Sequence, residues 1–169
     1  MEGIIEMKIA IKELVDRLRN MPDYFALNEQ KTSNLEEYFG QKFDCTSFPK
    51  GFLQFYKETD GITIGDVTLF AVNENSINYV LLFDEYASKD ETKKYLERIV
   101  LDGKDDLMFF ANDGEGGRFA FGKKEDSDKV YYLSMQRPEI TIIYDSFYDW
   151  LKNLVDVTIK DKIESLKND

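Results

Sequence analysis

The 169-residue sequence contains no histidine and a single cysteine, Cys45. Without histidine, the chain cannot form a Ser-His-Asp or Cys-His arrangement, a histidine-ligated metal site or the commonest general base. One cysteine excludes an internal disulfide and any zinc site built from several thiolates. Cys45 lies in the segment KFDCTSFP beside no visible base, which favours a small half-buried apolar residue over a nucleophile. An enzyme built from this chain would have to use carboxylates, lysine, tyrosine or bound Mg²⁺.

Long apolar runs and an excess of basic charge are also missing. No stretch approaches the roughly 18 apolar residues needed to span a bilayer, and the start MEGIIEMKIAIKELVDRL carries Glu2 and Glu6, unlike a signal peptide. The sequence therefore predicts a cytoplasmic protein that does not enter a membrane. There are 33 acids against 22 bases, a net charge of -11. Because nucleic-acid-binding proteins usually carry the opposite charge, no direct contact with DNA or RNA is expected.

The residues that are abundant favour a globular fold containing a sheet. Hydrophobic residues make up 43% of the chain, and the aromatic residues are 13 Phe and 10 Tyr with a single Trp150. Phenylalanine and tyrosine are enriched in strands. The length suits one domain with a real core, and no repeat or linker divides it. We therefore expect a single domain over residues 1–169.

The spacing of apolar residues predicts the order of the secondary-structure elements. Ser33 with Glu36, and Ser146 with Asp149, have the Ser-x-x-acid spacing that caps a helix start. Pro49 suits the first turn of a further helix. Helices are predicted at residues 7–19, from 33, at 49–60, at 76–100 in two pieces and from 146 to the end, and strands at 66–72, 106–111, 118–122, 129–135 and 139–145.

The last four predicted strands follow one another through short connections. Such strands can only be antiparallel neighbours, because parallel pairs need long crossovers. The predicted fold is therefore α+β, a mainly antiparallel sheet packed by N-terminal and C-terminal helices. Phe119 and Phe121 are two residues apart and should share one face of the sheet. We expect helices to pack against that face, including the one that bears Trp150.

The segment FFANDGEGGRFAFG, residues 109–122, contains four glycines and two acids together with two aromatic-rich runs. It lacks the Gly-Lys-Ser/Thr ending of a Walker loop, and a strand-like run rather than a helix follows Gly117, unlike a dinucleotide loop. Counted from Asn112, it also lacks the ligand spacing of a calcium loop. Asn and Gly tolerate the positive φ of hairpin turns. The sequence therefore predicts a structural turn, with no metal, phosphate or cofactor bound.

Three segments together resemble the SUKH superfamily, which includes fungal cell-wall-synthesis regulators of the Smi/Knr type. They are SFPKGFLQFYKETDG, FFANDGEGGRFAFG and ITIIYDSFYDWLKNL, which stand in the family's order over roughly residues 47–154. Residues 155–169 form a C-terminal helical extension outside the resemblance. The resemblance implies a SUKH-like domain that binds proteins and has no enzymatic activity. Many bacterial members look like immunity proteins that neutralise toxins, often nucleases.

The charge of the chain fits such a role, because an acidic surface accelerates association with a basic nuclease domain. The expected partner is a basic toxin protein, contacted by exposed acids and aromatic residues at strand ends and turns. For the two candidate tyrosines the alternative is a partly buried place in the sheet, and for the two acids of the 109–122 segment it is an ordinary solvated turn. The partner-binding candidates are Asp60, Asp113, Glu115, Tyr132 and Tyr144.

Two other functions remain open at this point. An enzyme would need a carboxylate pair such as Asp84 with Glu85, or Asp113 with Glu115. Neighbouring acids on a strand point to opposite faces, and turn acids are normally exposed with ordinary pKa values, so no catalytic residue is assigned. The other alternative is an intracellular regulator or scaffold of the Smi/Knr type without a toxin partner.

Overall fold

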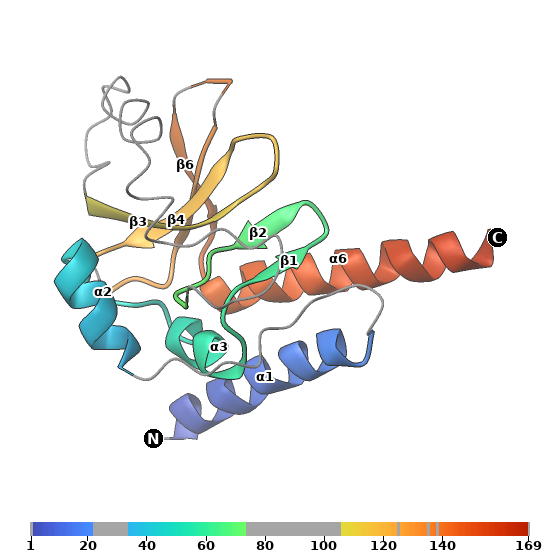
Figure 1. Ribbon diagram of the computed structural model, residues 1–169, viewed down its shortest axis with the longest axis horizontal. Coiled ribbons are helices and arrows are strands. Elements are labelled where there is room, and N and C mark those ends of the chain that lie inside the picture. The colour runs from blue at the N-terminus through green and yellow to red at the C-terminus, as the bar shows by residue number, and fades with distance from the viewer. Residues whose placement is uncertain are drawn as a thin grey trace.

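The computed structural model describes residues 2–21, 34–73, 106–124, 126–134, 136–137 and 139–168. The predicted helical segment 76–100, with Asp84 and Glu85, lies outside these residues, as does Ser33. Within them the chain forms four helices and six strands (Figure 1). In chain order these are α1 (Glu2–Arg19), α2 (Leu35–Phe43), α3 (Phe52–Glu58), β1 (Ile62–Ile64), β2 (Val67–Leu69), β3 (Leu107–Asn112), β4 (Arg118–Gly122), β5 (Val130–Leu133), β6 (Ile140–Tyr144) and α6 (Phe147–Lys167).

The strands form one antiparallel sheet in the order β1-β2-β3-β4-β5-β6, so every strand pairs with its neighbour in sequence. The predicted α+β fold with flanking terminal helices is confirmed. The last four predicted strands are present within a few residues of their expected bounds. The strand expected at 66–72 is shorter, and β1 was not predicted. Its three residues, Ile-Thr-Ile, are too few to show an alternating pattern, and they become a strand by pairing with β2.

A row of paired residues crosses the sheet at one end. Thr68 lies opposite Asn112, Asn112 opposite Arg118, Arg118 opposite Leu133, and Leu133 opposite Ile140. The β1–β2, β3–β4 and β5–β6 turns therefore all leave the sheet beyond this row. In Figure 1 they fan out from the top of the molecule, at the turn before β6, down to the green β1–β2 turn on the right. We call these three turns the hairpin end.

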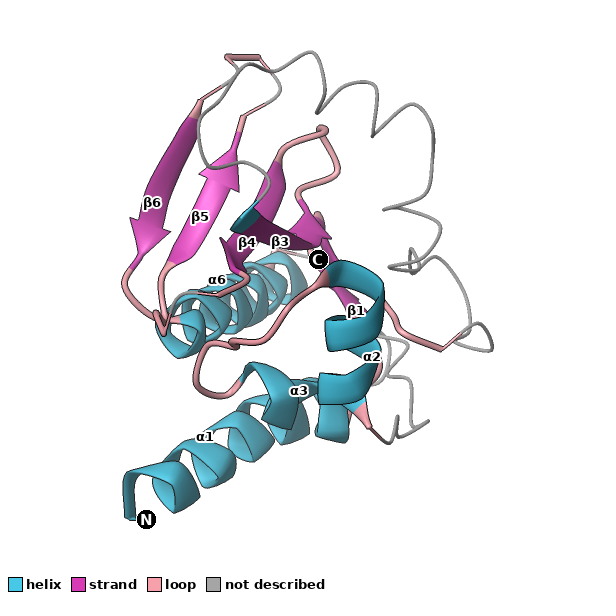
Figure 2. Cartoon of the chain, turned by 90° about the vertical axis from the view of Figure 1, so that its left-hand side faces the viewer, coloured by secondary structure: helices cyan, strands magenta, loops and turns pink. Residues whose placement is uncertain are grey.

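Helices cover one face of the sheet, and α1 packs against α3 and α6 on the outside (Figure 2). The layer between sheet and helices is a cluster of aromatic rings. Phe119 lies 5.1 Å from Trp150 of α6, and Phe121 lies 4.7 Å from Phe52 of α3, measured between ring centroids. Both phenylalanines thus face the helices, as predicted. Edge-on and tilted ring pairs of this kind stabilise a core beyond the area that they bury.

The helix ends follow the sequence only in part. Ser146 caps α6, because its Oγ accepts the Asp149 N–H at 3.0 Å. The helix continues unbroken to Lys167, in agreement with the predicted C-terminal helical extension. The capping box expected for α2 is wrong. The N-cap is Asn34 in the left-handed conformation, without a side-chain hydrogen bond. Pro49 precedes α3 instead of lying in its first turn, since the N-cap there is Gly51.

Candidate functional site

The β3–β4 turn joins residues 112 and 118 at the middle of the hairpin end. The Asp113 N–H donates to the Gly117 carbonyl at 3.1 Å and closes the turn. Gly114 and Gly116 have φ angles of 77° and 100°, a region that side chains with a Cβ rarely occupy. The prediction that this segment is a hairpin turn is confirmed.

The Asp113 carboxylate holds this turn together. Its Oδ1 accepts the N–H groups of Glu115 at 2.9 Å and Gly117 at 2.8 Å, and its Oδ2 accepts the Tyr132 hydroxyl at 2.6 Å. The interpretation of Asp113 as an ordinary solvated acid is therefore wrong, because three hydrogen bonds fix it in the frame of the turn. Glu115 is exposed, as that interpretation expected. The two acids have different roles although they are two residues apart.

Tyr132 reaches the turn from β5, where it lies opposite Phe119. The hydrogen bond to Asp113 is the main cause that raises the pKa of Tyr132 to about 12, and burial and the negative charges of Asp113 and Glu115 act in the same direction. A Cβ at position 117 would overlap both the Tyr132 hydroxyl and the Asp113 carboxylate. Glycine at this position is thus required by the close approach of a side chain from another strand.

The β1–β2 turn lies against the β3–β4 turn. A Cβ on Gly114 would come within 3.0 Å of the Asp66 carbonyl oxygen, and one on Gly65 within 3.4 Å of Thr158 on α6. Asp66 and Glu115, the residue after Gly114, are both exposed. The third turn, between β5 and β6, adds exposed Glu139 and exposed Arg137. The hairpin end therefore presents three exposed acids, which are Asp66, Glu115 and Glu139.

Asp60 lies elsewhere and is fully buried. Its two carboxylate oxygens accept the N–H groups of Val72 and Asn73, each at 2.8 Å. This pair of bonds fastens the chain after β2 at the open end of the β1–β2 hairpin, away from the Gly65 turn. The buried carboxylate does not reach the surface. Asp60 is therefore a structural residue, and its prediction as an exposed partner-binding residue is wrong.

Tyr144 lies on β6, opposite Val130 of β5. This pair is at the end of the sheet that is away from the hairpin end. Both Tyr144 and Tyr132 are partly buried against the core, which confirms the alternative interpretation of the two tyrosines as sheet residues. The structure thus brings Asp113, Glu115 and Tyr132 together and separates Asp60 and Tyr144 from them.

Sequence reasoning missed Asp66 and Glu139. Asp66 was placed inside a strand, but Gly65 and Asp66 form the tight turn between Ile64 and Val67. Two residues containing glycine between short β-branched runs are a hairpin signal. For Glu139 the sequence carries no comparable signal, because its place at the hairpin end follows only from the pairing of Leu133 with Ile140.

The buried thiol of Cys45 donates to the Ser47 carbonyl at 3.4 Å. Burial raises the pKa of Cys45 to about 11, in keeping with a structural residue. Among the described residues, no group of three or more Asp, Glu or Cys side chains is arranged to hold a metal ion. None of the helices that the structure describes is long and apolar enough to cross a membrane.

A protein-family comparison matches residues 27–153 to the SMI1/KNR4 family (SUKH-1). The chain belongs to this family. The match begins before α2, contains all six described strands and ends inside α6. The three turns of the hairpin end therefore lie within the matched residues. Helix α1 and the last two thirds of α6 lie outside the family match. A comparison with curated proteins found no match.

Proposed function

We propose that this SUKH-1 protein is a non-enzymatic binding module that neutralises a basic toxin domain, most naturally a nuclease. The hairpin end is the surface that contacts the partner. One observation carries the proposal: Asp66, Glu115 and Glu139 are exposed on turns that leave the sheet at the same end. Membership of the family supports a binding role over catalysis.

The construction of the β3–β4 turn suits rapid and specific binding. Glu115 extends from a backbone that the three hydrogen bonds of Asp113 hold in place. Binding to a fixed turn costs less ordering entropy than binding to a loose loop. The net charge of -11 would draw a basic partner toward the molecule at long range, and the exposed acids would orient it at short range.

The test begins with co-expression of this protein with the product of the adjacent gene. The proposal expects rescue of growth and a complex that co-purifies. A double variant, Asp66→Lys with Glu115→Lys, should slow association and reduce rescue, while its melting temperature stays unchanged because both side chains are exposed. The association rate of the unaltered pair should fall as salt rises, since the screening length is about 8 Å at physiological ionic strength.

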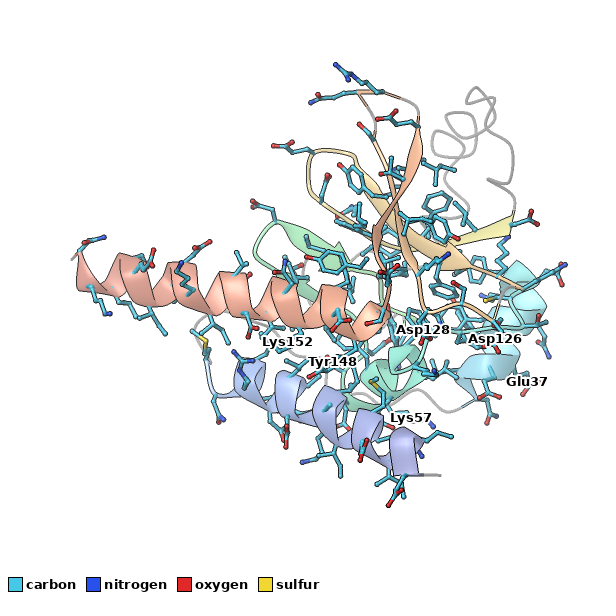
Figure 3. The ribbon with its side chains drawn as sticks, turned by 180° about the vertical axis from the view of Figure 1, so that it is seen from behind. Glu37, Lys57, Asp126, Asp128, Tyr148 and Lys152 are labelled. Carbon is cyan, nitrogen blue, oxygen red and sulfur yellow. The ribbon has the colours of Figure 1, made fainter. Side chains whose placement is uncertain are left out.

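A matched control keeps the same charge change and moves it elsewhere. Glu37→Lys with Asp126→Lys alters two exposed acids, one on α2 and one in the β4–β5 connection at the other end of the sheet (Figure 3). This control should bind nearly as fast as the unaltered protein. Equal slowing of both double variants would assign the effect to total charge and remove the hairpin end from the proposal. Failure to bind any adjacent gene product would favour the Smi/Knr-type regulator, and turnover of a small substrate would contradict both.

A further inference from the structure

A groove runs between the first two turns of α1, the segment 46–51 and α3. Its volume is about 660 Å³, within the range of about 300–1,000 Å³ typical of binding pockets. Apolar side chains from three parts of the chain line it, namely Ile4, Met7, Phe48 and Leu53. A smaller hollow of about 360 Å³ shares Glu36, Leu53 and Lys57 with the groove and continues toward α2.

The apolar face of α1 continues over this groove. Ile4 and Ile11 are seven residues apart, so both lie on one face of the helix. Ile11 is fully buried against the domain, whereas Ile4 is 62% exposed. The face that packs into the core farther along α1 is therefore exposed at its first turn. α1 also precedes the residues that the family match covers, so the α1 wall of this groove lies outside the match while its other walls lie within it.

The charge around the groove differs from that of the whole molecule. Lys8 on α1 and Lys57 on α3 are exposed, and neither forms an ion pair with any residue that the structure describes. Figure 3 shows Lys57 beside the N-terminal half of α1. Lys50 also lines the groove and pairs with Asp128 at 3.5 Å. Glu36 is the one acid among the described lining residues, although the chain has 33 acids and 22 bases.

We propose that this groove binds an amphipathic helix of a partner protein, with apolar side chains one turn apart and carboxylates on both sides of them. Helices commonly bind in this way, laying an apolar stripe into a groove through anchors at i, i+3 or i+4 and i+7. Ile4, Phe48 and Leu53 would contact the stripe. Lys8 and Lys57, on opposite walls, would meet the flanking carboxylates.

The chain's own α6 is a poorer occupant. Its last turns expose Ile163 and Leu166, and a second copy could in principle insert them. Lys160, which pairs with Glu164 at 3.9 Å, and Lys162 flank this stripe on the helix, however. They would face the lysines of the groove, and like charges placed across an interface oppose binding. A partner helix with acidic flanks has the complementary charge.

The test uses a fluorescent reporter beside the groove of the full-length protein. Gly3→Cys supplies a thiol for an environment-sensitive dye, since a side chain there meets no other atom within 4 Å and Cys45 is buried. One probe is a capped synthetic helix with leucines at i, i+3, i+4 and i+7 and glutamates at the flanking positions. The second probe has lysines in place of those glutamates. The acidic helix should give a saturable signal and bind about fivefold more tightly or better than the basic helix.

Charge reversal separates this site from general electrostatics. Lys8→Glu with Lys57→Glu should weaken binding of the acidic helix and improve binding of the basic one. The control Lys160→Glu with Lys167→Glu makes the same charge change on α6 and should leave both affinities unchanged. Circular dichroism should show that every variant is folded.

Three outcomes would overturn the proposal. The first is no saturable signal from the acidic helix, and the second is equal effects of the two double variants. The third is a dimer, detected by sedimentation, that Leu166→Glu dissociates and that the acidic helix also displaces. That result would make α6 of a second copy the occupant.

Discussion

The hydroxyl of Tyr132 is a single group whose removal tests the construction of the hairpin end. Tyr132→Phe keeps the ring and its contact with Phe119, at 5.2 Å between centroids, and removes only the bond to Asp113 Oδ2 at 2.6 Å. The Asp113 carboxylate then keeps its two backbone donors and loses its side-chain donor. The turn should remain in place with a lower free energy of unfolding for the whole domain.

Two estimates bound the size of the effect. A hydrogen bond to a charged group stabilises a protein by about 1.5–3 kcal/mol. The rise of the Tyr132 pKa from 10.0 to about 12 corresponds to about 2.7 kcal/mol of preference for the protonated hydroxyl before solvent screening. Tyr132 is partly exposed, so we expect the lower part of this range, about 1.5–2 kcal/mol. For a domain of this length, the melting temperature should fall by about 3–8 °C.

The assay is urea denaturation at several pH values, with Tyr144→Phe as the matched control. Tyr144 is also a partly buried strand tyrosine packed on the core, and its hydroxyl forms no hydrogen bond with the described residues, so the control should change stability little. The contribution of Tyr132 has a defined pH window. Because its folded pKa is raised, the stabilisation is fully present below pH 10 and is lost as the pH rises through about 12.

Equal stabilities for Tyr132→Phe and Tyr144→Phe at neutral pH would refute this reasoning. So would a difference between unaltered protein and Tyr132→Phe that stays constant up to pH 12. A double-mutant cycle with Asp113→Asn would then show whether any coupling between the two side chains exists. We expect a favourable coupling, because the two oxygens are in direct contact.

Three further predictions concern other parts of the fold. Gly117→Ala should lower the free energy of unfolding by about 1–3 kcal/mol in urea denaturation, because the new methyl group overlaps its neighbours; a neutral result would mean that the turn adapts. Asp60→Ala should cost about 2–3 kcal/mol, since two partly buried backbone N–H groups lose the carboxylate that accepts from both; wild-type stability would contradict that role. Cys45 should react with a thiol reagent at pH 8 about a hundredfold more slowly than in the urea-unfolded chain, because its pKa is about 11; equal rates would show that the thiol is accessible.

The sheet could be predicted from sequence where runs of β-forming residues are separated by clear turn residues. The runs LMFFA and RFAFG meet this condition, and both form strands close to the expected bounds. The start of α2 could not be predicted in the same way. Ser33 and Asn34 are both good capping residues, and the choice between them depends on how the helix packs, with Leu35 and Phe39 buried against the core.

The site was harder to predict because its decisive contact is not local. Asp113 and Tyr132 are 19 residues apart, and they meet only because β4 and β5 pair in the register that sets Phe119 opposite Tyr132. The length of the β4–β5 connection does not determine that register. The prediction that Asp60 is an exposed binding residue failed for a similar reason. An aspartate before glycine is typical of an exposed turn, whereas here the chain after β2 returns to place the Val72 and Asn73 N–H groups on its carboxylate.

The hairpin end separates what must stay constant from what is free to vary during evolution. Asp113, Gly117 and Tyr132 form a frame in which each side chain, or its absence, is fixed by the other two. Glu115 extends from that frame and Asp66 from the neighbouring β1–β2 turn, and neither forms an ion pair with the described residues. Substitutions at these two positions would change the pattern of charge shown to another molecule at almost no expense to folding. A lineage could therefore exchange one partner for another through these positions while the aromatic core and the frame of the turn remain unaltered.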